Sequence, residues 1–231
     1  MRKAFFALLL AIQFGTAQEL ALVRKDGKLG YISKEGTFAI APKFEAAKNF
    51  SEGLAAVEEN GKWGFIDRKG NWIIPAIFDD IKHFNSGICI VSKDKNWVYI
   101  NMKGEVLKAP DSDKLYHFED GIAFIKKDKK VGIINTKMEI VVPPKYDIIR
   151  SFKNGFARVK ENEKWGIINT AGAIIIPTEY DDVGRYNNNT GWVKKGDTFG
   201  LVNDGKFIPV EGAEKIWDFE TEDLSTEKED N

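Results

Sequence analysis

Short runs of alternating apolar and polar residues recur along the chain every 34 residues, and the repeat at residues 54–87 shows the pattern clearly. Residues 54–57 open a first strand, and residues 62–66 form a second. Between them lies Asn60-Gly61, a dipeptide that favours a two-residue type I′ hairpin turn because both residues tolerate positive φ. Asp26-Gly27 occupies the same place in the first repeat. Beyond the N-terminal segment no helical spacing of apolar residues is sustained, so the pattern predicts an all-β chain.

The second half of the repeat predicts a turn and two further extended pieces. Residues 67–70 begin with Asp and end with Gly, which is typical of a type I turn. Residues 72–74 form a third strand, which we expect to end at Pro75 because proline cannot donate a hydrogen bond to a neighbouring strand. Residues 78–81 form a fourth, short extended piece that leads to Phe84 and the next glycine turn.

Two adjacent columns of the second strand recur in phase across the repeats. One column is glycine, with Val98 in the third repeat, and we interpret it as a place where another backbone or ring lies close against the strand. The column before it alternates Trp with Leu, Val and Phe, so we expect those side chains to pack in the core. We predict a structural role in the repeat for Trp63, Gly64, Trp97, Gly132, Trp165, Gly166 and Gly200.

The first strand has one uniform and one variable face. A column of small residues and, two residues on, a column of β-branched residues share a face, which predicts burial. Cys89, the only cysteine, lies in the small column, so we interpret it as an inert apolar residue of the core. The opposite face varies, and we expect it either to meet a partner or to be covered by a second β layer. The candidate partner-facing residues are Leu22, Ile90, Phe124, Arg158 and Trp192.

Six repeats of this length predict one domain over residues 18–220. A 34-residue repeat is too small to bury its own core, so neighbouring repeats must share an interior. We therefore expect an all-β tandem array of six β-meanders with three to four strands each, arranged as an open twisted stack. The alternative is a closed six-bladed propeller, although propeller blades usually run to about 40–50 residues.

The two ends of the chain read differently from the repeats. Residues 1–17 have the layout of a secretory signal peptide: Arg2 and Lys3, an apolar run, and small residues before a cut after Ala17. The apolar run is shorter than the about 20 residues that span a bilayer, so we expect no stable membrane insertion after cleavage and a secreted or periplasmic protein. Residues 221–231 are rich in acids and predict a disordered tail.

The charge balance excludes one class of partner. Lys and Arg number 34 against 35 Asp and Glu, and the formal net charge is −1. No basic cluster stands out along the chain, and neutralising phosphates requires concentrated Lys and Arg. We therefore expect no nucleic-acid partner.

Paired carboxylates are the strongest candidates for chemistry. Asp79-Asp80 and Asp181-Asp182 offer groups that act in acid–base catalysis or hold calcium. Because the first acid of each pair recurs in nearly every repeat, we interpret it as a turn or backbone-capping residue. His83 and His117 are too few for a histidine-rich metal site, and no Cys-x-x-Cys or His-Glu-x-x-His motif occurs. We expect no catalytic residue, no metal and no cofactor.

The motifs Lys-Trp-Gly-Phe-Ile at 62–66 and Lys-Trp-Gly-Ile-Ile at 164–168 are each followed by proline, then Phe-Asp or Tyr-Asp, and then Phe-x-x-Gly or a variant of it. In this arrangement the chain resembles the bacterial WG (KWG) repeat family over residues 19–219. Repeats one, three and four depart from the Trp-Gly pair with Leu29-Gly30, Trp97-Val98 and Val131-Gly132. The resemblance implies a β-rich array with no established catalytic activity.

Three functions remain open from the sequence. The leading hypothesis is a non-catalytic exported protein that acts as a scaffold at the cell envelope or exterior and binds a protein partner through its repeat surface. The second is a carbohydrate-binding module that uses exposed aromatic residues, with Phe124, Trp192 and Trp217 as candidates. The third is a hydrolase built on the paired aspartates.

Overall fold

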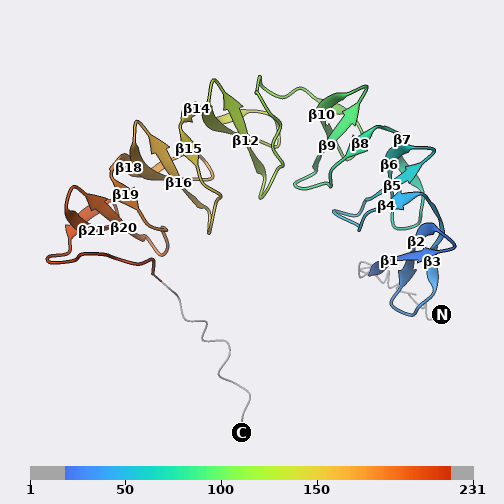
Figure 1. Ribbon diagram of the computed structural model, residues 1–231, viewed down its shortest axis with the longest axis horizontal. Coiled ribbons are helices and arrows are strands. Elements are labelled where there is room, and N and C mark those ends of the chain that lie inside the picture. Colours follow the sequence, from blue (N-terminus) through green and yellow to red (C-terminus); the bar gives the residue numbers. More distant parts are fainter. Residues whose placement is uncertain (1–18, 220–231) are drawn as a thin grey trace, which may run out of the picture. The chain divides into compact units, whose positions relative to one another are not determined.

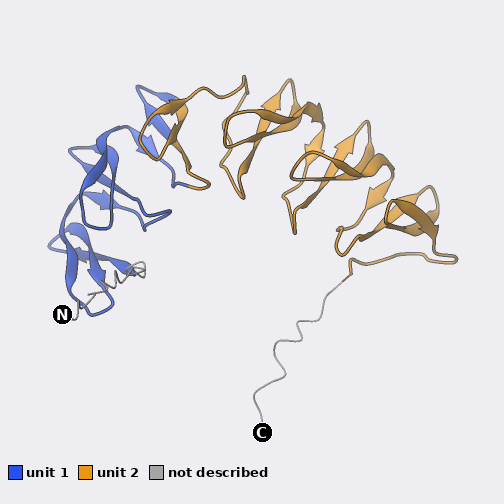
Figure 2. Ribbon diagram, turned by 180° about the vertical axis from the view of Figure 1, so that it is seen from behind, with its two compact units in different colours: residues 1–84, 91–96 blue, residues 85–90, 97–231 orange. Residues whose placement is uncertain are grey.

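The computed structural model describes residues 19–219, which contain strands and turns and no helix (Figure 1). The predicted signal peptide and acidic tail lie outside the described residues. The chain divides into two compact units, Met1–Phe84 with Val91–Asn96 and Asn85–Ile90 with Trp97–Asn231 (Figure 2). The boundary between unit 1 and unit 2 therefore passes through the third repeat.

Each of the six repeats is an antiparallel meander of three strands, as the pattern predicts. The first strands are β1 (Leu20–Lys25), β5 (Ala55–Glu59), β9 (Ile88–Lys93), β12 (Ile122–Lys127), β16 (Phe156–Glu161) and β20 (Thr190–Lys195). The second strands are β2 (Lys28–Ser33), β6 (Lys62–Ile66), β10 (Asn96–Asn101), β13 (Lys130–Asn135), β17 (Lys164–Asn169) and β21 (Thr198–Asn203). The third strands are β3 (Phe38–Phe44), β7 (Trp72–Phe78), β11 (Val106–Leu107), β14 (Ile140–Tyr146), β18 (Ile174–Tyr180) and β22 (Lys206–Pro209).

The fourth, short piece of a repeat belongs to the sheet of the next repeat. These strands are β4 (Ala46–Ala47), β8 (Asp80–Ile81), β15 (Ile148–Ile149) and β19 (Asp182–Val183). Each pairs antiparallel with the first strand of the following repeat, so that β4 pairs with β5 and β19 with β20. The sheet order is therefore short, first, second, third, as in β15-β16-β17-β18. Consecutive repeats are joined by backbone hydrogen bonds as well as by packing.

The two predicted turns form for the predicted reasons. Asn60 and Gly61 have φ values of 53° and 70°, which is the pair of positive values that a type I′ hairpin requires. In the second turn, Asp67 accepts hydrogen bonds on Oδ1 from the backbone N–H groups of Lys69 and Asn71 at 2.8 and 2.9 Å. Gly70 ends that turn at φ 83°, a conformation that glycine adopts without strain.

The prediction that the third strand ends at Pro75 is wrong. β7 runs from Trp72 through Pro75 to Phe78 and pairs with β6 across two register shifts. Trp63 faces Phe78 and Phe65 faces Ile74, so two steps along β6 correspond to four along β7. Pro75 lies in the resulting bulge of an edge strand, where no N–H is required of it.

The bulge explains the glycine column. A β-carbon built on Gly64 would lie 2.6 Å from the carbonyl oxygen of Ile74 and 2.7 Å from the backbone nitrogen of Ala76. The third-strand backbone makes the same close approach to Gly30, Gly132 and Gly166. The sequence-based interpretation of this column is confirmed, and the approaching group is the bulged third strand of the same repeat.

Repeats three and six show what happens without this bulge. In repeat three β11 is only two residues long and pairs in regular register with Tyr99 and Ile100, and here Val98 replaces the glycine. In repeat six β22 also pairs without a register shift, and Gly200 is kept because the ring of Phe207 lies against it. Valine therefore occupies this column in repeat three, where no bulge crosses the strand, whereas the ring of Phe207 keeps the glycine in repeat six.

The core lies between consecutive repeats. In unit 2 one buried cluster contains Ile133 and Tyr146 of repeat four together with Ala157, Val159 and Ile168 of repeat five. Unit 1 has an equivalent cluster from repeats one and two. The small and β-branched columns are buried as expected, and Cys89 is 1% exposed. Repeat one is the exception, because its β1 has no strand before it within the described residues and its Ala21 is exposed.

The described chain is thus an all-β series of tandem repeat sheets, as the sequence predicts. The choice between an open stack and a closed six-bladed propeller stays a prediction.

We expect the substitution Gly166→Ala to lower the free energy of unfolding by about 2–3 kcal/mol, because the added methyl group would force the β18 bulge away from β17. Val98→Ala in the same column is the control, and its expected cost is about 1 kcal/mol because no bulge crosses it. Urea denaturation midpoints measure both. Equal losses in the two variants would contradict the steric role of the glycine.

Candidate functional site

Two cavities in unit 2 occupy equivalent places in consecutive repeats. One is lined by His117, Glu119, Phe124, Phe152 and others, and we call it the aromatic cavity. The second contains residues exactly one repeat later in most of these positions, and we call it the basic cavity. Adding 34 converts Glu119 to Lys153, Phe124 to Arg158, Ser151 to Arg185 and Phe152 to Tyr186. The fold thus repeats one cavity and the sequence changes its chemistry.

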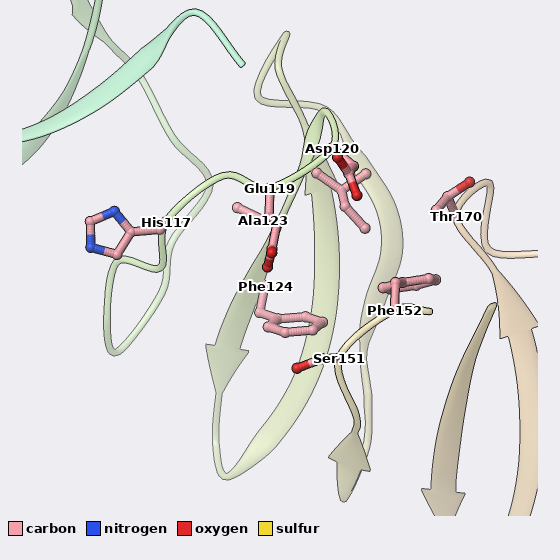
Figure 3. Close-up of a pocket in the computed structure, with 9 residues that line it drawn as sticks. His117, Glu119, Asp120, Ala123, Phe124, Ser151, Phe152 and Thr170 are labelled. Carbon is pink, nitrogen blue, oxygen red and sulfur yellow. The ribbon is translucent and has the colours of Figure 1, made fainter. Parts of the chain in front are cut away.

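The aromatic cavity lies between the first strand of repeat four and the segment after its short strand. Phe124 projects from β12, and Phe152 follows β15, while Thr170 comes from the turn after β17 (Figure 3). Phe124 also meets Tyr116 edge-on, with ring centroids 6.2 Å apart. The aromatic cavity has a volume of about 50 Å³, which accommodates only a small chemical group.

The basic cavity is larger and carries four cationic side chains. Arg150, Lys153, Arg158 and Arg185 line it, together with Tyr186, and its volume is about 240 Å³. None of the described residues that line it is acidic. Within residues 19–219, Arg185 alone of the four has a carboxylate within ion-pairing distance. This concentration of positive charge lies in a chain whose formal net charge is −1.

Neighbouring contacts hold the arginines in place. Arg158, which is half-buried, donates a hydrogen bond from Nη1 to the carbonyl oxygen of Val183 at 3.2 Å. The guanidinium of Arg150 lies over the indole of Trp165, 5.8 Å from the ring centroid. Such contacts orient a guanidinium and leave its remaining N–H groups available to an anion.

Asp218 anchors the chain at the rim of the basic cavity. Its Oδ1 accepts hydrogen bonds from the backbone N–H of Arg185 and from Nε1 of Trp192, both at 2.8 Å. Its Oδ2 lies 3.6 Å from Nε of Arg185. A carboxylate of this chain therefore already contacts one of the four cations.

The five predicted partner-facing residues differ in burial and in the groups that they contact. Ile90 is a correction: it is 6% exposed and belongs to a core cluster, because the following repeat covers it. Leu22 is half-buried and packs against the core cluster of unit 1. Phe124 and Arg158 line the two cavities. Trp192 is half-buried and lies against Gly184, with its Nε1 bound by Asp218.

The expectation that the tryptophan column packs in the core is wrong for Trp97, which is 42% exposed, and only partly met at Trp63 and Trp165, which are half-buried. The tryptophan is the second residue of its strand, directly after the hairpin turn, and so lies at the end of the sheet. Phe65, two residues after Trp63, is buried. A cation covers the half-buried rings: Nζ of Lys48 lies 5.4 Å from the ring centroid of Trp63.

The recurrent acids cap the hairpin of the next repeat, in agreement with the predicted backbone-capping role. Asp181 accepts a hydrogen bond on Oδ1 from Nζ of Lys164 at 2.5 Å and one on Oδ2 from the backbone N–H of Gly196 at 2.6 Å. Asp147 makes the equivalent pair of contacts with Lys130 and Asn162. The lysine of each Lys-Trp-Gly motif, Lys62 or Lys164, binds the acid 17 residues later, and Lys130 makes the same contact in repeat four.

The second acids of the two pairs also bind backbone. Asp80 and Asp182 each accept a hydrogen bond from the N–H of the next residue, at 2.7 and 2.9 Å. In the described part of the chain, no group of three or more His, Cys, Asp or Glu residues has the arrangement of a metal site. Nor does this part contain a helix with the length and hydrophobicity needed to cross a bilayer.

Sequence reasoning missed Arg150, Lys153 and Arg185. The sequence register did contain a signal for these residues. The equivalent positions one repeat earlier hold the non-basic residues Tyr116, Glu119 and Ser151, respectively. The signal was hidden because these residues follow the short strand, in a segment that the pattern assigns only to a turn.

Comparison with known proteins identifies one matching family model. The model, described as "WG containing repeat", matches the chain five times in tandem, at residues 30–63, 63–97, 99–130, 132–165 and 165–199. Among curated proteins, none matches this sequence.

Solved structures resemble the chain only weakly. A eukaryotic initiation factor structure shares 14% identity with a TM-score of 0.45, over 85% of this chain and 60% of that one. Hsv2 of Kluyveromyces lactis shares 10% identity with a TM-score of 0.38, over 80% and 70% of the two chains. A protein of unknown function from Bacteroides caccae shares 12% identity with a TM-score of 0.28, over 84% and 94%. The chain thus spans less than two thirds of the first of these, and the scores support no functional argument.

The capping acids make stability depend on pH. Hydrogen bonds from Lys164 and from the backbone N–H of Gly196 lower the pKa of Asp181 below its ordinary value of 3.8. A pKa that is lower in the folded than in the unfolded state stabilises the fold above pH 3.8, and this contribution is lost as the pH falls through the lowered value. We therefore expect Asp181→Asn to be less stable than wild type at neutral pH and to lose less stability on acidification.

Asp113→Asn is the matched control, because Asp113 has the equivalent position but no ion pair within residues 19–219. Urea midpoints measured from neutral pH to about pH 2.5 test the effect. Parallel pH profiles for wild type and Asp181→Asn would contradict it.

Proposed function

The chain belongs to the WG-repeat family, and we propose that it is an exported, non-catalytic binding protein that holds a protein partner in the cavities between its repeats. The observation that carries the proposal is the equivalence of the aromatic and basic cavities. One backbone arrangement occurs in consecutive repeats with Phe124 in the first cavity and Arg158 at the same place in the second. Equivalent cavities in consecutive repeats that differ in their lining residues are suited to binding successive segments of an extended ligand.

The recurrent polar groups support a binding role over catalysis. The carboxylates that attract attention in the sequence, Asp79, Asp147 and Asp181, each bind a lysine and a backbone N–H of the next hairpin. Asp80 and Asp182 each accept a hydrogen bond from the backbone N–H of the following residue. These carboxylates are therefore engaged in joining repeats.

Location outside the cytoplasm is part of the proposal. It is supported by the positive, apolar and small-residue order of residues 1–17, which lie outside the described residues. A partner would then be met in the periplasm or at the cell exterior.

The test is affinity capture from native cells with the tagged full-length protein, followed by mass spectrometry. We expect one protein to be recovered in stoichiometric amount with wild type. We expect it to be lost with Phe124→Ala/Arg158→Ala, which removes the side chain at the equivalent position of both cavities. Lys103→Gln/Lys137→Gln is the control, since both lysines are exposed turn residues of unit 2 that line neither cavity. A partner that binds all three proteins equally would contradict the assigned surface.

Phe124 packs against a core cluster, so its truncation is expected to cost about 1–2 kcal/mol. Thermal melts therefore accompany the capture. Phe124→Leu/Arg158→Gln, which retains most of the apolar contact, replaces the first variant if that variant does not fold.

A carbohydrate-binding function is the second candidate, and one observation favours it. Trp217 is 70% exposed, with Nζ of Lys215 4.7 Å from its ring centroid, so its indole is available for stacking on a sugar. Trp192 is less suitable because Gly184 and Asp218 hold its ring.

If this function is correct, a cell-envelope polysaccharide fraction will quench tryptophan fluorescence, and Trp217→Ala will abolish the quenching because the stacking ring is gone. Trp97→Phe is the control, since Trp97 is the other exposed tryptophan of unit 2. Absence of quenching across the fractions would exclude the carbohydrate function.

A further inference from the structure

The basic cavity concentrates positive charge on four cationic side chains, and only Arg185 among them pairs with a carboxylate of the described residues. Arg150, Lys153 and Arg158 have no ion pair with any carboxylate among residues 19–219. Exposed cations usually lie dispersed among acids, and three or four of them around one concave site attract anionic groups. Arginine is the residue best suited to this because its planar guanidinium binds a carboxylate through two parallel hydrogen bonds.

Among residues 19–219, the anionic group in contact with a cation of this cavity is the carboxylate of Asp218. Asp218 binds both the backbone and the side chain of Arg185 at the rim. It also opens the acidic C-terminal sequence, in which Glu220, Glu222, Asp223, Glu227, Glu229 and Asp230 are accompanied by a single cation, Lys228. The contact therefore lies two residues before an acid-rich stretch of the sequence begins.

Resting on the function proposed above, we propose that the basic cavity binds the carboxylates of an acidic peptide segment. The ligand chemistry is a short peptide with several Asp or Glu side chains, held by Arg150 and Arg158 with Lys153 at the margin. Such a segment can come from the protein partner or from residues 220–230 of this chain. When the chain's own segment is bound, it competes with the partner, so the same contact sets the affinity of the site.

The cavity volume fits this ligand. About 240 Å³ accommodates a few carboxylate groups with their water, whereas the aromatic cavity one repeat earlier holds about 50 Å³ and has Glu119 in place of Lys153. An acidic peptide is therefore expected at the basic cavity and not at its equivalent.

Fluorescence anisotropy of a labelled hexaglutamate peptide, titrated with the full-length protein at low salt, tests the proposal. We expect binding that Arg150→Gln/Arg158→Gln weakens by roughly tenfold or more, the loss expected when hydrogen bonds to charged groups are removed. Lys103→Gln/Lys137→Gln changes the net charge by the same amount and is expected to leave the affinity within about twofold, because both lysines lie outside the cavity. A hexaglutamine peptide is expected not to bind.

A variant with the six acids of residues 220–230 changed to Gln or Asn decides between the two sources. Tighter hexaglutamate binding by this variant than by wild type shows that the chain's own segment competes for the cavity. Equal affinity assigns the cavity to an acidic segment of another protein. Absence of binding to both proteins, or equal weakening by the arginine and lysine variants, overturns the proposal.

The outcome is separable from that of the capture experiment. If no partner is captured while hexaglutamate binding depends on Arg150 and Arg158, the proposed function fails and the anion site stands. If a partner is captured through Phe124 and Arg158 while hexaglutamate does not bind, the function stands and the ligand assigned to the basic cavity is wrong.

Discussion

The close approach of the bulged third strand to the glycine of the second strand is the constraint on which the repeat depends. At Gly64 the bulge of β7 occupies the space that a β-carbon would fill. The extra residues of the bulge let β7 continue to Phe78, which faces Trp63 across the sheet. The chain then enters β8 and pairs with β9. A tight backbone contact within one repeat therefore sets where the chain crosses into the next.

Three kinds of interaction join one repeat to the next where the chain passes between them. The short strand adds backbone hydrogen bonds, the buried cluster adds apolar contact, and the capping acid ties the lysine before the tryptophan to the following hairpin. These interactions recur with a 34-residue spacing, except that no short strand joins repeats three and four, and they set the backbone positions around both cavities. The lining is free to change, as the exchange of Phe124 for Arg158 shows. Phe124 both lines the aromatic cavity and packs against a core cluster, so one column contributes to the cavity lining and to the core.

The sequence predicts the repeat well because its signals are local. Period-two alternation and the Asn60-Gly61 and Asp67–Gly70 turns specify strands and reversals without reference to the rest of the chain. Pro75 misleads because the rule against proline in strands holds for regular pairing, and the bulge of an edge strand removes the hydrogen bond that proline cannot make. Burial of the Trp column was overestimated because the column shows residue type but not distance from the end of the sheet.

The candidate site was only partly predictable for a different reason. Phe124 and Arg158 were found as members of a variable column, and column variability needs only the sequence register. Arg150, Lys153 and Arg185 were missed because they lie in connecting segments, and their convergence depends on how the short strand of one repeat pairs with the first strand of the next. Ile90 was misassigned since the same column is covered in repeat three and open in repeats four and five.

The joint between repeats three and four affects the cooperativity of folding. Its β11 is two residues long, and the sheet of repeat four, β12-β13-β14, receives no short strand from it. In place of that strand, the backbone N–H of Asp113 donates to the carbonyl oxygen of Lys126, and Ser112 Oγ donates to the same oxygen and accepts from the N–H of Lys126. In a linear chain of repeats, folding cooperativity is transmitted through nearest-neighbour coupling, and it is interrupted at the weakest joint. We therefore expect unfolding to be less cooperative across the joint between repeats three and four, where no short strand crosses, than across the joint between repeats five and six.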